Sequence, residues 1–218
     1  MADSYQPGVR SKAKRAYKRA SYDYETVHAV FDDNPMCHVG YVIDGQPYVT
    51  PTTQWRRENR LYWHGSSAGR MIKILKDGAP CCVTVSEFNG YVMARSQTGH
   101  SANYRSAMAF GTCSSIEDRD EKEEALYHMF EHLYPGRWDD VRGLTEQELK
   151  ATTVIVMEIE EASAKVRTGL PADNDEDYAN IDCWAGVLPV VRGFGPPEDD
   201  GRLKDGITFP DNLKAFKP

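Results

Sequence analysis

The residues best suited to chemistry lie in segment 62–70, Tyr-Trp-His-Gly-Ser-Ser-Ala-Gly-Arg. The pattern predicts a strand that ends at His64, a glycine turn, two serines, and a helix with Arg70 in its first turn. Free amides and the positive dipole end of such a helix favour an anion. The serine hydroxyls, the guanidinium and Lys73 would add donors suited to phosphate. The segment therefore indicates a phosphate site, although an ordinary serine helix cap explains the same residues equally well.

A second polar cluster spans residues 100–106 and leads directly into the apolar run 107–110. Polar side chains at the entrance of a strand often line the rim of a ligand site. A turn with local side-chain caps is an equally good interpretation of this cluster.

The other histidines and the standard catalytic motifs give little evidence for a metal site or a catalytic site. His128 and His132 stand four residues apart on a predicted helix, but no glutamate directly follows His128, as the zincin motif requires. His38 lies in an early strand and is interpreted as a core or rim residue. The chain has no Gly-x-Ser-x-Gly elbow, no Walker loop and no Rossmann glycine fingerprint. Hydrolase, kinase and NAD(P) dehydrogenase functions therefore lack support, and no metal site is expected.

The charge of the chain limits its partners. The 218 residues carry a net charge of −7 and a pI near 5.4, which argues against nonspecific binding to nucleic acid or anionic lipid. The N-terminal arm is an exception, with basic residues at positions 10, 12, 14, 15, 18 and 19. Such an arm could touch RNA or a membrane, but a solvated arm, or one packed on a partner, is the favoured interpretation.

The cysteines and the hydropathy pattern indicate the compartment. The five cysteines are odd in number and form no Cys-x-x-Cys pair, so neither a disulfide framework nor a zinc ribbon is suggested. No apolar run approaches the ~20 residues of a membrane span, and the N-terminus lacks a secretory segment. We expect a cytoplasmic protein with no nucleic-acid or membrane partner.

The elements that must position these residues are mostly strands. Asp44-Gly45 predicts a hairpin between strands 37–43 and 46–53. Further strands are predicted at 60–64, 81–86, 91–97 (after an Asn89-Gly90 turn), 104–116, 152–159 and 184–191, with a surface loop at 172–182. Helices are predicted at 22–31, 68–75 and 121–133, and Thr145 and Glu148 form a capping box. The pattern favours a mainly β protein with peripheral helices, built as one barrel. Its parts are a basic arm (1–20), a barrel domain (21–192) and a C-terminal tail (193–218).

The order and spacing of several motifs resemble a known family. The motifs are His38-Val39-Gly40, Asp44-Gly45-Gln46-Pro47, residues 61–65, Gly69-Arg70, residues 101–106 and residues 184–189. Together they resemble the pyridoxamine 5′-phosphate oxidase-like flavin-nucleotide-binding proteins, in the branch that includes the nitroimidazole-resistance proteins, over about residues 20–192. The resemblance implies an FMN-binding split β-barrel and a two-fold homodimer with a flavin in each interface cleft.

The resemblance also implies a set of cofactor contacts. His64, Ser66, Ser67 and Arg70 would surround the FMN phosphate, and other contacts would lie along the ring and the ribityl chain. The full set is Thr50, Pro51, Thr52, Tyr62, Trp63, His64, Gly65, Ser66, Ser67, Arg70, Cys82, Val83, Thr84, Asn103, Tyr104, Ser106 and Trp184. Trp184 would come from the partner subunit to cover the isoalloxazine. His64 occupies the place of the proposed functional histidine in the Tyr-Phe-His motif of the resistance branch.

The leading hypothesis is an FMN-dependent oxidoreductase that acts on an unknown small molecule. In such a protein the flavin performs the redox chemistry, so no catalytic triad is needed. The alternatives are a flavin-binding carrier or sensor without turnover, a deazaflavin reductase, and a haem-binding split barrel with His64 or His100 as the axial ligand. Haem ranks lower because Ser66, Ser67 and Arg70 suit a phosphate better than a porphyrin.

Overall fold

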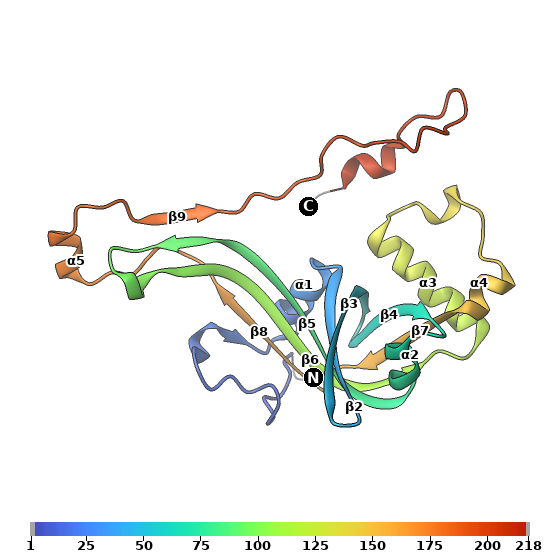
Figure 1. The fold of residues 1–218 in the computed structure, drawn as a ribbon, viewed down its shortest axis with the longest axis horizontal. Helices are drawn as coiled ribbons and strands as arrows, with labels where there is room; N and C mark the ends of the chain where they lie inside the picture. The colour runs from blue at the N-terminus through green and yellow to red at the C-terminus, as the bar shows by residue number, and fades with distance from the viewer. Residues whose placement is uncertain (1–2, 217–218) are drawn as a thin grey trace.

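The computed structural model describes residues 3–216 and shows a mainly antiparallel sheet with a few peripheral helices (Figure 1). The strands are β1 (Ala20–Ser21), β2 (Met36–Ile43), β3 (Gln46–Arg57), β4 (Arg60–Ser66), β5 (Asp77–Met93), β6 (Ser101–Ser115), β7 (Thr152–Glu158), β8 (Glu161–Arg167) and β9 (Gly186–Pro189). The helices are η1 (Tyr17–Arg19), α1 (Tyr24–Asp32), α2 (Arg70–Leu75), η2 (Gln97–Gly99), α3 (Arg119–Leu133), η3 (Trp138–Asp140), α4 (Glu146–Ala151), α5 (Asp175–Asn180) and η4 (Asp211–Ala215).

Six strands close into a barrel. The sheet order is β1-β8-β6-β7-β4-β3-β2-β5-β9, and an additional β5–β6 pairing joins β6, β7, β4, β3, β2 and β5 in a ring. Strand β6 divides its pairing, since its residues 104–110 bind β8 and its residues 113–115 bind β7. The barrel is therefore split along one side, which confirms the expected fold of a split β-barrel with peripheral helices.

Local sequence explains the hairpins. Asp44 (φ 50°) and Gly45 (φ 81°) form the tight turn between β2 and β3, as their Asp-Gly signal predicts. Asn89-Gly90 carries a similar signal, but here the predicted turn is wrong, because β5 runs straight through it as a β-bulge. A Cβ on Gly90 would lie 2.6 Å from the carbonyl oxygen of Leu188, so the glycine lets β9 approach β5. The chain instead reverses at η2.

Two apolar clusters hold the fold together. The larger fills the barrel and includes Leu61, Trp63, Val83 and Ile155, each fully buried. The smaller lies between the sheet and the helices α3 and α4, and includes Trp55, Tyr62, Leu126, Met129 and Val154. Alternate residues of β4 thus point to opposite sides, because successive side chains of a strand face opposite ways.

The helices begin where the sequence places caps. Asp23 accepts a hydrogen bond from the amide of Thr26 at α1, and Asp118 caps α3. The capping box predicted at Thr145 and Glu148 is confirmed at α4. Residues 172–182, expected as a loop, contain the short helix α5, and strand β8 was not predicted at all. No helix in residues 3–216 is both long and apolar enough to cross a membrane.

Both ends of the chain form long arms. The N-terminal arm lies against the body through Tyr5, whose side chain is buried and whose hydroxyl donates to Asn59 Oδ1 (2.7 Å). The C-terminal part leaves the body after β9 and runs as an extended segment to η4 (Figure 1). There Asn212 Nδ2 donates to the carbonyl oxygen of Pro135 (3.2 Å). Strands β5 and β6 reach beyond the barrel as one long hairpin, beside β9 and α5 (Figure 1).

Candidate functional site

The predicted phosphate segment crosses from β4 into α2. The N-cap of α2 is Gly69, and no side chain caps it, so the serine-cap alternative is not realised. The backbone amides of this turn are already engaged, since Ser67 N donates to Ala151 O (3.0 Å) and Gly69 N donates to Ser66 O (2.7 Å). Ala68 N donates to Ser66 Oγ (3.3 Å). An anion here would therefore depend on side chains rather than on the amides of residues 67–69.

Arg70 supplies the charge at this corner. Its guanidinium carbon lies 4.5 Å from the ring centroid of Tyr48, and Tyr48 stacks on Tyr41 (5.7 Å between ring centroids). The hydroxyl of Tyr41 in turn lies 3.1 Å from Thr50 Oγ1. Within residues 3–216, Arg70 has no carboxylate at ion-pair distance, whereas Arg56 pairs with Asp32 at 2.6 Å. Arg70 is thus held by an aromatic face while its charge stays available, a combination that suits an anionic ligand.

His64 lies on the outer side of β4, toward the smaller apolar cluster. Its ring centroid is 6.3 Å from that of Trp55, and Val154 is its neighbour on β7. The Nδ1 atom is buried without a hydrogen-bond partner. Burial lowers the pKa of His64, because desolvation disfavours the imidazolium. At neutral pH this histidine is therefore a neutral imidazole with unused hydrogen-bonding capacity, the form that ligates metals and cofactor atoms.

The pleat separates the predicted contacts on β4 and β5 into two sets. The side chains of Trp63 and Val83 are fully buried in the barrel core, so only their backbone is available to a ligand. Cys82 and Thr84 lie on the opposite face of β5, where Thr84 is paired with the exposed His38 of β2. Burial raises the pKa of Cys82 to about 11, which keeps its thiol protonated at neutral pH.

The remaining predicted residues lie along the hairpin that leaves the barrel. Asn103 is buried and engaged, because its Oδ1 accepts from Arg167 Nη1 (2.5 Å) and its Nδ2 donates to Gly169 O (3.1 Å). His100 is exposed, with its Nδ1 2.9 Å from the carbonyl oxygen of Ser96. Trp184 precedes β9 and is 66% exposed. Tyr104 and Ser106 lie on β6. Within the single chain, Thr50 and Arg70 are linked by the contacts of Tyr41 and Tyr48. Asn103 and Trp184 lie in a different region, near the long hairpin of β5 and β6.

The structure adds Tyr48 to the candidate site. The sequence analysis missed this residue, although Tyr48 stands two positions before Thr50 and therefore shares its face of β3.

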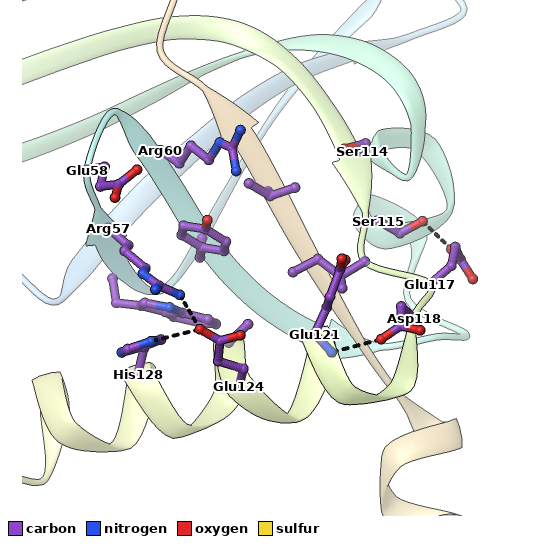
Figure 2. Close-up of a pocket in the computed structure, with 15 residues that line it drawn as sticks. Arg57, Glu58, Arg60, Ser114, Ser115, Glu117, Asp118, Glu121, Glu124 and His128 are labelled. Atoms are coloured by element: carbon purple, nitrogen blue, oxygen red, sulfur yellow. Dashed lines mark hydrogen bonds and ion pairs between the residues drawn. The ribbon is translucent and has the colours of Figure 1, made fainter.

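A separate cleft of about 660 Å³ lies between α3 and strands β3 and β4. Figure 2 shows Arg57 and His128 both directed at the carboxylate of Glu124, at 2.7 and 3.5 Å. Arg60, at the same cleft, pairs with Glu158 at 2.7 Å. Trp55 and Tyr62 stack on its floor with ring centroids 5.7 Å apart. The cations of this cleft are thus already neutralised, and the network ties α3 to the sheet.

No group of three or more His, Cys, Asp or Glu side chains within residues 3–216 is arranged to hold a metal ion.

Comparison with known proteins shows the family of this chain. The model of the family described as pyridoxamine 5′-phosphate oxidase matches residues 23–166. The chain belongs to this family. The match spans the closed barrel and most of β8, including the whole of β4 and α2. A search of curated proteins finds no match.

Two solved structures resemble nearly the whole chain. The flavocytochrome Anf3 from Azotobacter vinelandii is 43% identical, with a TM-score of 0.91, over 98% of this chain and 99% of that one. The FAD and heme binding protein from Mycobacterium smegmatis is 33% identical, with a TM-score of 0.86, over 91% of this chain and 97% of that one. A candidate 5-nitroimidazole antibiotic resistance protein from Bacteroides thetaiotaomicron shares the fold, at 24% identity and a TM-score of 0.57, over 67% of this chain and 86% of that one.

Proposed function

We propose that this protein binds a flavin and a haem and exchanges electrons between them and a small molecule. One observation carries the proposal: two relatives that match the chain over nearly its whole length are named a flavocytochrome and an FAD and heme binding protein. This extends the expectation from the sequence, which placed haem below FMN as an alternative. A bound flavin would supply hydride and one-electron chemistry, and a bound haem one-electron chemistry.

The residues at the start of α2 fit a flavin phosphate. The hydroxyls of Ser66 and Ser67 are exposed, and the guanidinium of Arg70 has no competing carboxylate among the residues that the structure describes. Charge-assisted hydrogen bonds from such donors are the strong contacts to phosphate. The role of this chain in the reaction would be to bind and orient the flavin, with the Tyr48 ring holding Arg70 in place. Both FMN and FAD carry the required phosphate, and the named relative favours FAD.

We assign His64 as the first candidate for the residue that would hold the haem iron. Its buried, unpartnered Nδ1 marks a group that the protein alone leaves unsatisfied, and its lowered pKa keeps the imidazole neutral. His100 is the second candidate, because a backbone carbonyl fixes its Nδ1 and leaves Nε2 free, an arrangement common among ligating histidines. If His64 does not ligate iron, its role as the functional residue next to the flavin stands as the alternative.

We also propose a homodimer with the cofactors at its interface. Support comes from large apolar side chains that the single chain leaves exposed near its C-terminal end, namely Trp184 (66%), Val191 (90%) and Phe194 (64%). Apolar surface gathered in this way is typical of an interface. Light scattering of the full chain, and of a chain ending at residue 192, tests the assembly. A monomer at micromolar concentration would refute it.

Reconstitution tests the proposed cofactors. The full chain is titrated with FMN, FAD and hemin, followed by visible absorption, and the variants His64→Ala and His100→Ala are compared with the wild type. We expect saturable flavin binding in all three proteins and loss of the haem Soret band in His64→Ala. Loss of the Soret band in His100→Ala alone would transfer the ligand role to His100. A wild type that takes up neither flavin nor hemin would refute the proposal.

A further inference from the structure

The N-terminal basic arm forms a second pocket on the outer face of the sheet. A cavity of about 260 Å³ lies between residues 10–14 of the arm and strands β5, β6 and β8. Lys12 and Lys14 line it from the arm, and Lys165 lines it from β8. Ser106 and Ser163 contribute hydroxyl groups from β6 and β8, whereas the hydroxyl of Thr84 on β5 already donates to the carbonyl oxygen of Ala107 (3.0 Å). The wall of the pocket thus combines ammonium and hydroxyl donors.

The arm is fixed at this place by specific contacts. Ser11 is 5% exposed, and both its amide and its hydroxyl donate to Glu161 Oε2 (3.2 and 2.9 Å). Ala13 N donates to the hydroxyl of Tyr22 (2.8 Å). Lys12 therefore stands between two residues whose amides are bound by the body. These contacts hold the basic segment over the sheet. They offset the conformational entropy that the segment loses when it is ordered, so it does not behave as a solvated tail.

The charges of the pocket are not balanced by the protein. Arg10 is neutralised, because it pairs with Glu161 at 2.8 Å and with Glu160 at 2.9 Å. By contrast, Lys12, Lys14 and Lys165 have no carboxylate at ion-pair distance within the described chain. Like charges gathered around one small cavity repel each other, and an anion that enters the cavity relieves this repulsion.

We propose that this pocket binds a phosphate group beyond the one held at Arg70. Phosphate fits because its several oxygens can accept hydrogen bonds from the ammonium and hydroxyl donors at the same time. The pocket is distinct from the Arg70 corner, since the arm and strands β5, β6 and β8 form it. Thr84 and Ser106 are also residues that the family resemblance places beside the flavin. The phosphate is therefore either the second phosphate of FAD or that of a separate reactant that meets the flavin, a role that rests on the proposed function.

A charge-matched comparison of variants tests the pocket. The pocket variant is Lys12→Gln/Lys14→Gln/Lys165→Gln, and the control is Lys18→Gln/Arg19→Gln/Lys122→Gln, whose residues do not line the cavity. Calorimetry measures the affinity of the full chain for FAD and FMN, and of the flavin-loaded protein for inorganic pyrophosphate. Charge-assisted contacts predict a loss of about tenfold or more for the phosphate that occupies the pocket.

The probes distinguish the two sources of the phosphate. A fall in FAD affinity alone, with FMN unchanged, assigns the pocket to FAD. Unchanged affinity for both flavins, with loss of pyrophosphate binding, assigns it to a separate reactant. If the pocket variant and the control behave alike toward all three probes, the proposal is wrong. A wild-type chain that binds pyrophosphate through these lysines but binds no flavin would refute the proposed function and leave the pocket standing.

Discussion

The cleft under α3 differs from the Arg70 corner and from the pocket under the basic arm in how its charged side chains are paired. The cleft is larger than the pocket under the basic arm, and its cations Arg57 and Arg60 are paired with Glu124 and Glu158. At the Arg70 corner and in the pocket under the basic arm, Arg70 and Lys12 have no carboxylate partner within residues 3–216. A paired charge on the surface mainly joins two elements, whereas an unpaired one can attract a ligand. Unbalanced charge, rather than volume, therefore distinguishes the two candidate binding sites from the cleft.

The same contrast applies to the histidines. His128 faces the cleft and reaches Glu124 at 3.5 Å, so its ring already has a charged neighbour. His64 has a buried Nδ1 with no partner. Buried polar groups are rarely left unsatisfied in proteins. The unsatisfied nitrogen therefore points to a bound group on the side of β4 that faces the smaller apolar cluster.

The largest expected effect is on flavin affinity when Arg70 is removed. Arg70→Ala should weaken flavin binding by about 1.5–3 kcal/mol, since it deletes a charge-assisted phosphate contact. The matched control Arg57→Ala, in the cleft, should leave flavin affinity unchanged. Fluorescence titration with FAD and FMN measures both variants. Equal affinities for the two variants would remove the distinction between the two regions.

A second effect concerns stability and pH. The folded chain holds the proton of His64 less tightly than the unfolded chain, whose histidine pKa is near 6.5, because burial lowers the pKa of His64. Protonation below about pH 6.5 therefore favours the unfolded state, and the free energy of unfolding should rise with pH up to that value. Urea unfolding of the cofactor-free protein from pH 5 to 7.5 measures this slope.

His64→Asn should flatten part of that slope. The rest should persist through His28, whose pKa is also lowered, mainly by burial. An unchanged slope in His64→Asn would show that His64 titrates like an exposed histidine, contrary to its place under α3 and α4.

A smaller effect is expected at Tyr48, which holds Arg70. Tyr48→Leu removes the aromatic face 4.5 Å from the guanidinium, and should cost flavin binding about 0.5–1 kcal/mol. Because leucine keeps an apolar side chain at this partly buried position, the melting temperature should change less than the flavin affinity. The same fluorescence titration checks the affinity. A loss as large as that of Arg70→Ala would mean that Tyr48 contacts the flavin itself.

The smallest effect is expected in the cleft. Glu124→Gln breaks the exposed pair with Arg57 and the contact with His128, and surface pairs of this kind contribute little to stability. We expect a slight fall in melting temperature by calorimetry and unchanged flavin and haem content. Loss of either cofactor from this variant would make the cleft a functional site.

The sequence predicted the elements whose signals are local. The Asp44-Gly45 hairpin, the capping box at Thr145 and the strand after it all depend on neighbouring residues. The Asn89-Gly90 signal failed because glycine with positive φ serves a bulge as well as a turn, and only the distant Leu188 distinguishes them. Strand β8 was missed because its buried positions are Ala162 and Ala164, which carry little β propensity.

For the candidate site, the sequence named residues but not the side of the sheet to which each side chain points. The resemblance named consecutive residues, such as Cys82, Val83 and Thr84, but the pleat turns Val83 into the core and leaves its neighbours on the other face. The sequence could not show that Arg70 lacks a carboxylate partner in the described chain, or that Nδ1 of His64 is buried. Both properties depend on residues that are far apart in the chain. The pocket under the basic arm was equally invisible, because it needs the arm, β5, β6 and β8 together.

The absorption spectrum of the purified full-length protein, wild type beside Arg70→Ala and Arg57→Ala, tests the central claim most directly. The wild type should show flavin bands near ~450 nm and a haem band near ~400 nm. The flavin bands should weaken in Arg70→Ala and persist in Arg57→Ala. A wild type without flavin bands, even after added FAD or FMN, would contradict the account, as would flavin that is lost from Arg57→Ala and retained in Arg70→Ala.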